Sequence, residues 1–137
     1  MSDAAGIRAQ MSQVESQIDG CEICIADLQE KIAKLKEVKP KVAQIKENIV
    51  VMEIRLNESI WGQERWLGDN KNKYNEAASE SLITPYQNYY DAVDDVLDSI
   101  NDAITRMENE ILEQQGLIGK LRAWWNSLCN ELSNAFN

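Results

Sequence analysis

Cys21 and Cys24 form a Cys-x-x-Cys motif and are the first residues to consider for chemistry. Redox pairs of this kind lie at a helix N-terminus, where the helix dipole lowers the thiol pKa. Here the pair falls inside a long run of heptad spacing, which does not favour redox chemistry. A structural zinc site needs four ligands, and the chain adds only Cys129 and no histidine. We interpret the three cysteines as small core or flanking residues and leave their individual roles open.

The absence of histidine narrows the possible chemistry further. It excludes Ser/His and Cys/His nucleophile pairs, histidine general bases and histidine metal ligands. We therefore expect a protein with no catalytic residues, no metal and no cofactor.

The charge and hydropathy of the chain exclude other classes of protein. Its 137 residues include 23 acidic and 14 basic side chains, a formal net charge of −9. This balance disfavours binding to nucleic-acid phosphates or to anionic lipid. No stretch approaches 18 consecutive apolar residues, and the N-terminus lacks the apolar segment of a secretion signal, so we expect no membrane span. A cytoplasmic protein is expected, and any export would use another route.

Apolar and small residues recur at alternating spacings of four and three in the first half of the chain, as in a coiled coil. After Leu35 one extra step of three intervenes, and Pro40 follows shortly afterwards. Such a discontinuity overwinds a coiled coil locally, and proline removes a helical hydrogen bond. We predict one long helix bent near Lys39-Pro40, or two helices nearly end to end. The core positions are Val14, Ile18, Cys21, Ile25, Leu28, Ile32 and Leu35, then Val38, Val42, Ile45, Ile49, Met52 and Leu56.

The second half repeats the heptad pattern, and only Gln114 is polar at a core position. Thr84-Pro85-Tyr86-Gln87 has the residue types of a helix start with a capping box. No stretch alternates with period two, so the fold class is all-α. The core positions are Tyr86, Tyr90, Val93, Leu97, Ile100, Ile104, Met107, Ile111, Gln114, Ile118, Leu121, Trp125, Leu128 and Leu132.

Residues 60–70 separate the two heptad runs and contain two tryptophans, two glycines and a Gly-Asp-Asn cluster typical of a helix end. We predict a single helical domain, 1–137, folded as a long antiparallel hairpin. One helical arm covers 3–66, the turn covers 66–70 at Trp66-Gly68, and the second arm covers 70–136. An interruption of the second arm near Thr84-Pro85 is left open.

Two charge blocks predict how the arms align. Residues 31–46 carry a net charge of +5, and residues 90–105 carry −5. If the chain reverses near Leu67-Gly68, residue i faces approximately residue 136 − i, and the two blocks meet. Exposed ion pairs contribute only about 0–1 kcal/mol each, but they select orientation. The alternative is that both blocks are solvated faces without partners.

Apolar residues also occur outside the heptad positions. Val50, Val51 and Ile54 add apolar area to the first arm, and Trp124 adds aromatic area beside the core position Trp125. A two-helix seam is too narrow to bury side chains that point in several directions. Exposed patches of this kind mark interaction sites, so we predict that these four residues contact another helical chain.

The Trp66-Leu67-Gly68 motif between two amphipathic helices resembles the WXG superfamily of small type VII secretion proteins. The charged stretch that follows, the heptad run and the C-terminal Trp124-Trp125 are similar to the longer LXG-associated α-helical proteins of Gram-positive bacteria. The resemblance implies a non-enzymatic adaptor or targeting chaperone that pairs with the helical LXG domain of a toxin for type VIIb secretion. It also implies a second small WXG-like protein as a further partner and export together with the toxin.

The same resemblance implies a secretion signal, an aromatic residue followed four residues later by an acid. Tyr90 and Asp94 fit this form, although they lie far from the C-terminus. Their alternative role is structural, with Tyr90 in the core and Asp94 paired with the lysine block. The alternative function for the whole chain is a structural coiled-coil protein that self-assembles, beginning with a homodimer.

Overall fold

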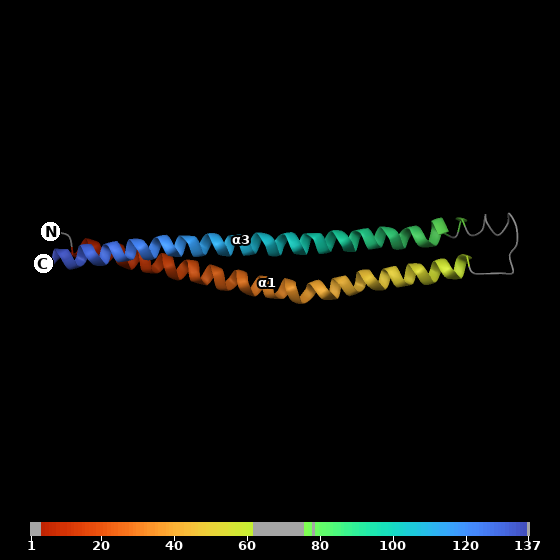
Figure 1. Ribbon diagram of the computed structural model, residues 1–137, viewed down its shortest axis with the longest axis horizontal. Helices are drawn as coiled ribbons and strands as arrows, with labels where there is room; N and C mark the ends of the chain where they lie inside the picture. The colour runs from red at the N-terminus through yellow and green to blue at the C-terminus, as the bar shows by residue number, and fades with distance from the viewer. Residues whose placement is uncertain (1–3, 62–75, 78, 137) are drawn as a thin grey trace. The chain divides into compact units, whose positions relative to one another are not determined.

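The computed structural model describes residues 4–61, 76–77 and 79–136. Helix α1 spans Ala4–Trp61, the short π-helix η1 spans Ser79–Ile83, and helix α3 spans Thr84–Ala135 (Figure 1). The all-α class is therefore confirmed. The predicted turn at Trp66 and Gly68, and the segment 66–70 around it, lie outside the described residues.

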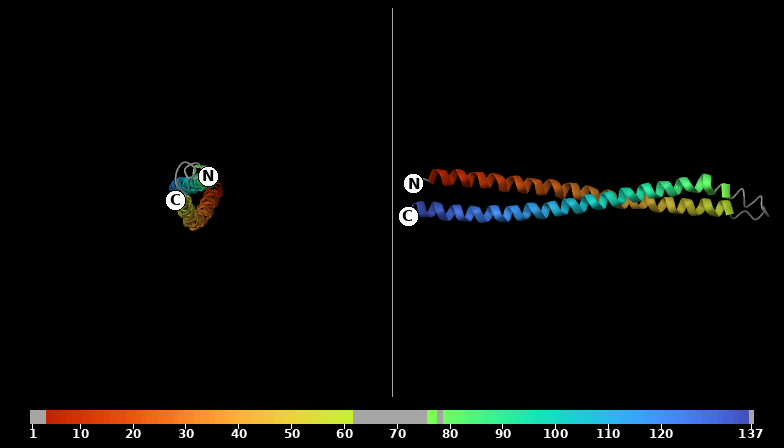
Figure 2. Two further views of the ribbon diagram at one scale, coloured as in Figure 1. Left: turned by 90° about the vertical axis from the view of Figure 1, so that its right-hand side faces the viewer. Right: turned by 90° about the horizontal axis from the view of Figure 1, so that it is seen from above.

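The chain forms two compact units. The terminal unit comprises Met1–Lys34 and Ile104–Asn137, and the central unit comprises Leu35–Ala103. Within each unit a stretch of α1 lies beside an antiparallel stretch of α3, and both views agree on this (Figures 1 and 2). The antiparallel helical hairpin is thus confirmed.

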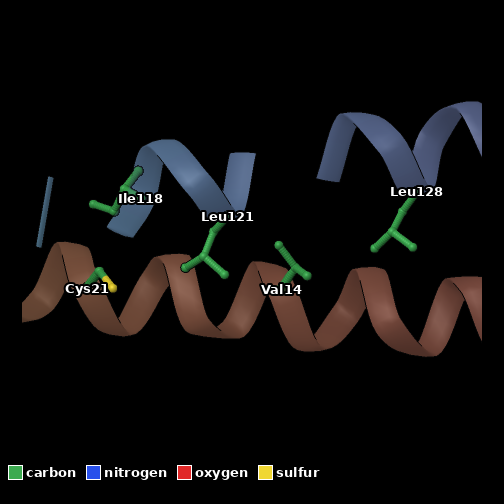
Figure 3. Close-up of a cluster of buried hydrophobic side chains, with 5 residues drawn as sticks. All are labelled: Val14, Cys21, Ile118, Leu121 and Leu128. Atoms are coloured by element: carbon green, nitrogen blue, oxygen red, sulfur yellow. The ribbon is translucent and has the colours of Figure 1, made fainter. Parts of the chain in front are cut away.

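The core of the terminal unit is a single apolar seam between the two helices. Figure 3 shows side chains from both helices pointing toward one another across it. Leu128 is 2% exposed and Val14 is fully buried. Ile7, Met11, Ile18, Ile25 and Trp125 pack against this cluster, which consists of Val14, Cys21, Ile118, Leu121 and Leu128. Burial of each large apolar side chain contributes about 1.5–3 kcal/mol, so this seam stabilises the hairpin.

The heptad positions were predicted correctly for the terminal unit and for all of α3. Every predicted core position from Val14 to Leu35 is buried or half-buried, and so is every position from Tyr86 to Leu132. Gln114 is half-buried, and α3 continues without interruption through Gly116 and Gly119. The four–three spacing alone was sufficient to find these inward faces.

Helix α1 continues through Pro40, which lies inside it and is exposed. The alternative of two helices placed end to end is therefore wrong. The lost N–H bond of a proline is tolerated within one continuous helix because the freed carbonyl can face water. The bend at Lys39-Pro40 stays a prediction.

The extra step of three predicted after Leu35 is also wrong. Val38, Ile45 and Met52 were assigned to the core but are 42%, 45% and 54% exposed. Apart from the exposed Lys39, the inward face instead keeps the heptad of the preceding stretch, which brings Lys46 and Glu53 inward beside the buried Ile49. A regular seam has to stay in contact with the partner helix, and here that constraint outweighs the apolar character of three residues.

The helix start predicted at Thr84 is the point where the π-helical turn Ser79–Ile83 gives way to α3. Pro85 has no N–H to donate to the preceding turn, which suits a change of helical winding at this position. Ile83 at the end of the turn is 6% exposed and anchors this segment.

Candidate interaction surface

One side of the seam in the central unit is polar. Lys46 of α1 is half-buried, and its ammonium donates a hydrogen bond to the Asp94 carboxylate of α3. The same Nζ lies 4.9 Å from the ring centre of Tyr90, a cation–π contact. Tyr90 and Asp94, the residues of the predicted secretion signal, are therefore both in contact with Lys46. These contacts are of the structural kind that was given above as the alternative to a secretion signal for both residues.

These contacts raise the pKa of Lys46 above its ordinary value of 10.5. The hydrogen bond to Asp94 is the largest cause, and the contact with Tyr90 is the second. Both favour the charged ammonium over the neutral amine. Lys46 is therefore a cation at neutral pH.

The polar side continues one heptad further along α1. Gln87 Nε2 donates a hydrogen bond of 3.1 Å to Glu53 Oε1. A shallow groove of approximately 370 Å³ lies here, lined by Val50, Glu53, Gln87, Tyr90 and Asp91. Two carboxylates and an amide line this groove together with Val50 and Tyr90, so its surface is about half polar and half apolar.

The charge blocks align less closely than predicted. Lys31 and Lys34 form ion pairs of 3.0 Å and 3.3 Å with Asp27 and Glu30 of the same helix. The bond to Asp27 raises the pKa of Lys31. In the described part of the chain, Lys46 is the one member of the lysine block with an ion pair to the acidic block. The block from 31 to 46 is thus mainly a solvated face.

The predicted register is displaced along α3. Lys46 contacts Tyr90, the residue that the 136 − i rule places opposite it. Glu53 bonds to Gln87 rather than to residue 83, and Glu22 pairs with Arg122 at 3.6 Å rather than with residue 114. The apolar layers set the alignment, because exposed ion pairs are too weak to do so.

The four residues predicted to contact a partner do not form one patch. Val50 is half-buried on the polar groove, whereas Val51 and Ile54 are 41% and 52% exposed on the outer side of α1. Trp124 belongs to the terminal unit and is 42% exposed, while Trp125 packs against the core. The expectation that the seam cannot bury all four is confirmed. Their role as partner contacts stays a prediction.

The Cys-x-x-Cys motif lies in the middle of α1. Cys21 is buried in the apolar cluster, and Cys24 and Cys129 are half-buried free thiols. Cys21 thus has the core role predicted for it. In the described residues, no group of three or more cysteine and acidic side chains is placed to hold a metal ion.

The sequence analysis missed an apolar groove on the other side of the central seam. Ile49, Met52, Pro85, Tyr86 and Tyr89 line it, and almost all of its surface is apolar. Met52 was assigned to the core and Tyr89 to no site, yet they are 54% and 58% exposed here. The sequence signal that could have found this groove is a pair of apolar rows, one on α1 and one on α3, each with a spacing of seven residues and each beside the true seam.

The fold and its surfaces define an all-α, antiparallel helical-hairpin protein whose described residues form a groove of mixed polarity and an apolar groove beside the central seam. In the described part of the chain, no helix is both long and apolar enough to cross a membrane. A model of the YwqH-like family matches residues 6–130, and the chain belongs to that family. No curated protein and no solved structure was found to match it. Membership of the WXG superfamily stays a prediction.

Proposed function

We propose that this protein is a non-enzymatic adaptor that pairs with the helical LXG domain of a toxin and presents it for type VIIb secretion. The observation that carries the proposal is the family assignment together with the hairpin's unburied apolar side chains. YwqH-like proteins are LXG-associated. Val51, Ile54 and Trp124 remain 41–52% exposed in the free chain. Large apolar side chains left at the surface of a helical pair are suited to binding further helices.

The test is co-purification with the LXG domain of a toxin from the native host. A complex of defined mass that survives gel filtration would support the adaptor role. The double variant Val51→Asp with Trp124→Ala should weaken that complex by two orders of magnitude or more if both residues are buried in it. Circular dichroism is the control, because lost helicity would mean that these residues stabilise the hairpin itself.

The same exposed side chains also suit the second candidate function, a self-assembling coiled-coil protein. Sedimentation equilibrium separates the two functions. A stable homo-oligomer that ignores the LXG domain would overturn the adaptor role. A monomer or weak dimer that forms a heterocomplex would overturn the structural role.

The role of Tyr90 and Asp94 as a secretion signal can be separated from their structural role. Asp94→Asn and Lys46→Met each remove the ion pair, but only Asp94→Asn removes the acid of the signal. If the pair is structural, both variants should reduce export in the native host to a similar small extent. Export abolished by Asp94→Asn alone would assign the signal to this pair.

A further inference from the structure

Two apolar rows flank the central seam on the side of the apolar groove. Val38, Ile45 and Met52 follow one another at intervals of seven on α1, and Tyr89 and Val96 do so on α3. All five are 42–58% exposed. Residues seven apart occupy the same side of a helix in a coiled coil, so each set forms a continuous row.

The two rows belong to one face of the central unit. Met52 and Tyr89 line the same groove. Because α1 and α3 are antiparallel, one heptad back along α1 from Met52 corresponds to one heptad forward along α3 from Tyr89. Ile45 therefore lies level with Val96, and Val38 lies level with the half-buried Ala103. The result is an apolar face that runs along two heptads of α1, about 21 Å from Val38 to Met52 at 1.5 Å per residue.

The flanks of this face carry an asymmetric charge. Residues three or four positions from a row residue are its neighbours on the helix surface. On the outer side of the α1 row these neighbours are Lys41, Asn48 and Arg55, and on the outer side of the α3 row they are Pro85, Ala92 and Ser99. All six are exposed. The face is thus bordered by two cations on one side and by small, uncharged residues on the other.

Three acids of α3 lie away from this face, whereas Asp95 and Asp102 lie beside the border residue Ser99, one position further from the apolar rows. Asp91 lines the polar groove on the opposite side of the seam, and Asp94 is paired with Lys46 there. Asp98 follows Asp91 by one heptad and so shares its side. Among the residues that directly border the apolar rows, the two charged ones, Lys41 and Arg55, are both basic, although the chain has a net charge of −9.

We propose that this face binds one amphipathic helix of a partner protein, with an apolar heptad row and acidic residues along the edge that meets Lys41 and Arg55. The inference rests on the proposed function and names the chemistry of the partner. Ala92, Ser99 and Ala103 are small enough to let a third helix approach α3 closely. Apolar contact supplies the affinity, and the two cations select the direction and register of the incoming helix.

A second copy of this chain fits the face less well. In a symmetric dimer the same patch meets itself. The residues that directly border the rows would then contribute only Lys41, Arg55 and uncharged side chains, so neither cation would meet an acid at the border itself. A different chain with an acidic flank satisfies both cations.

The test uses two synthetic helical peptides with the same Leu/Ile heptad, one with Glu and one with Lys at the flanking positions. Fluorescence anisotropy measures their binding to the full chain at low and at high salt. The Glu peptide should bind several-fold to about tenfold tighter, although the net charge of the protein favours the Lys peptide. The preference should shrink at high salt and in the double variant Lys41→Gln with Arg55→Gln. Equal binding, or tighter binding of the Lys peptide, would overturn the inference.

A matched pair of variants locates the site. Ile45→Gln with Val96→Gln alters the apolar face, and Val51→Gln with Ile54→Gln alters similarly exposed residues on the outer side of α1. Glutamine is a good helix former, and all four residues are partly exposed, so both variants should fold. The first should weaken binding of the Glu peptide about a hundredfold, and the second should leave it within a few-fold. The reverse result would move the site to the outer side and overturn the inference.

Binding of an LXG domain from a toxin of the native host separates this inference from the proposed function. If that domain binds the wild type but is unaffected by the Ile45→Gln/Val96→Gln variant, the adaptor role stands and this site is wrong. If it does not bind while the Glu peptide does, the site stands and the adaptor role is wrong. A wild-type homodimer that the same variant abolishes would show that the occupant is a second copy, which also overturns the inference.

Discussion

The terminal and central units use the same two helices in opposite ways. In the terminal unit, apolar side chains from both helices fill the seam, and Val14 and Leu128 are essentially inaccessible. In the central unit, Lys46 and Glu53 occupy inward positions, and Val38, Ile45 and Met52 are left outside. The same heptad period therefore yields a sealed core in one unit and an apolar outer face in the other. The terminal unit therefore has the tighter seam and the central unit carries the aligned apolar rows, although Trp124 of the terminal unit is exposed as well.

The largest expected effect is in the sealed core. Leu128→Ala removes a side chain that is 2% exposed, and such changes cost about 2–5 kcal/mol of unfolding free energy. Ile45→Ala in the central unit is the matched change and should cost less than about 1 kcal/mol, because Ile45 is already 45% exposed. Urea unfolding followed by circular dichroism measures both. Equal losses would break the comparison between the units.

The second expected effect concerns Pro40, an exposed residue inside α1 of the central unit. A proline in a helix interior costs up to about 3 kcal/mol relative to alanine. Pro40→Ala should therefore raise helicity and thermal stability. The control is Ala43→Ser, a mild substitution at an exposed residue in the same stretch, which should change little. No gain in Pro40→Ala would mean that the bend predicted here is required by the packing of the unit.

The third expected effect is a gain in the terminal unit. A β-carbon added at Gly119 of α3 would meet no atom within 4 Å beyond the adjoining residues and the backbone of its own helix. Gly119→Ala should therefore stabilise the protein by about 0.5–1 kcal/mol, because alanine has the higher helix propensity. Gly116→Ala, which is equally unobstructed, should do the same in a parallel melt. A loss of stability in both would contradict the packing described for this unit.

The smallest expected effect is the pH dependence of the polar seam. The pKa of Lys46 is raised in the folded state. The contribution of Lys46 to the unfolding free energy is therefore fully present below the unfolded pKa near 10.5, and it is lost as pH rises through the folded pKa. The difference in unfolding free energy between wild type and Lys46→Met should therefore be constant at neutral pH and decrease above about pH 10.5. Lys31→Met serves as the control for a lysine paired within one helix. A difference that grows with pH would have the wrong sign.

How much of this could be predicted from the sequence differs between the two units. Val14 to Leu35 and Tyr86 to Leu132 were found from spacing alone, because there the apolar residues and the geometric seam coincide. They diverge after Leu35, where the row at Val38, Ile45 and Met52 runs one residue before the true inward row. Choosing between adjacent rows requires the position of α3, which no local pattern contains.

The polar contacts, too, could be predicted from the sequence only in part. The antiparallel pairing was predictable from the charge blocks, yet Lys31 and Lys34 pair within α1, and Lys46 alone of the block crosses to α3 in the described residues. Long side chains choose among several nearby acids at little cost in energy. Tyr90 and Asp94 were located by a motif, but the structure assigns them contacts with Lys46 that the motif does not describe.

Hydrogen–deuterium exchange tests the central claim most directly, that one unit holds the fold and the other binds a helix. In the free protein, amides near Val14–Ile32 and Ile104–Leu128 should exchange most slowly, since exchange there requires opening of the sealed seam. Saturation with the Glu-flanked helical peptide should add protection to residues 38–52 and 85–99 and leave the terminal unit unchanged. Slowest exchange in the central unit, or new protection confined to the terminal unit, would contradict the account.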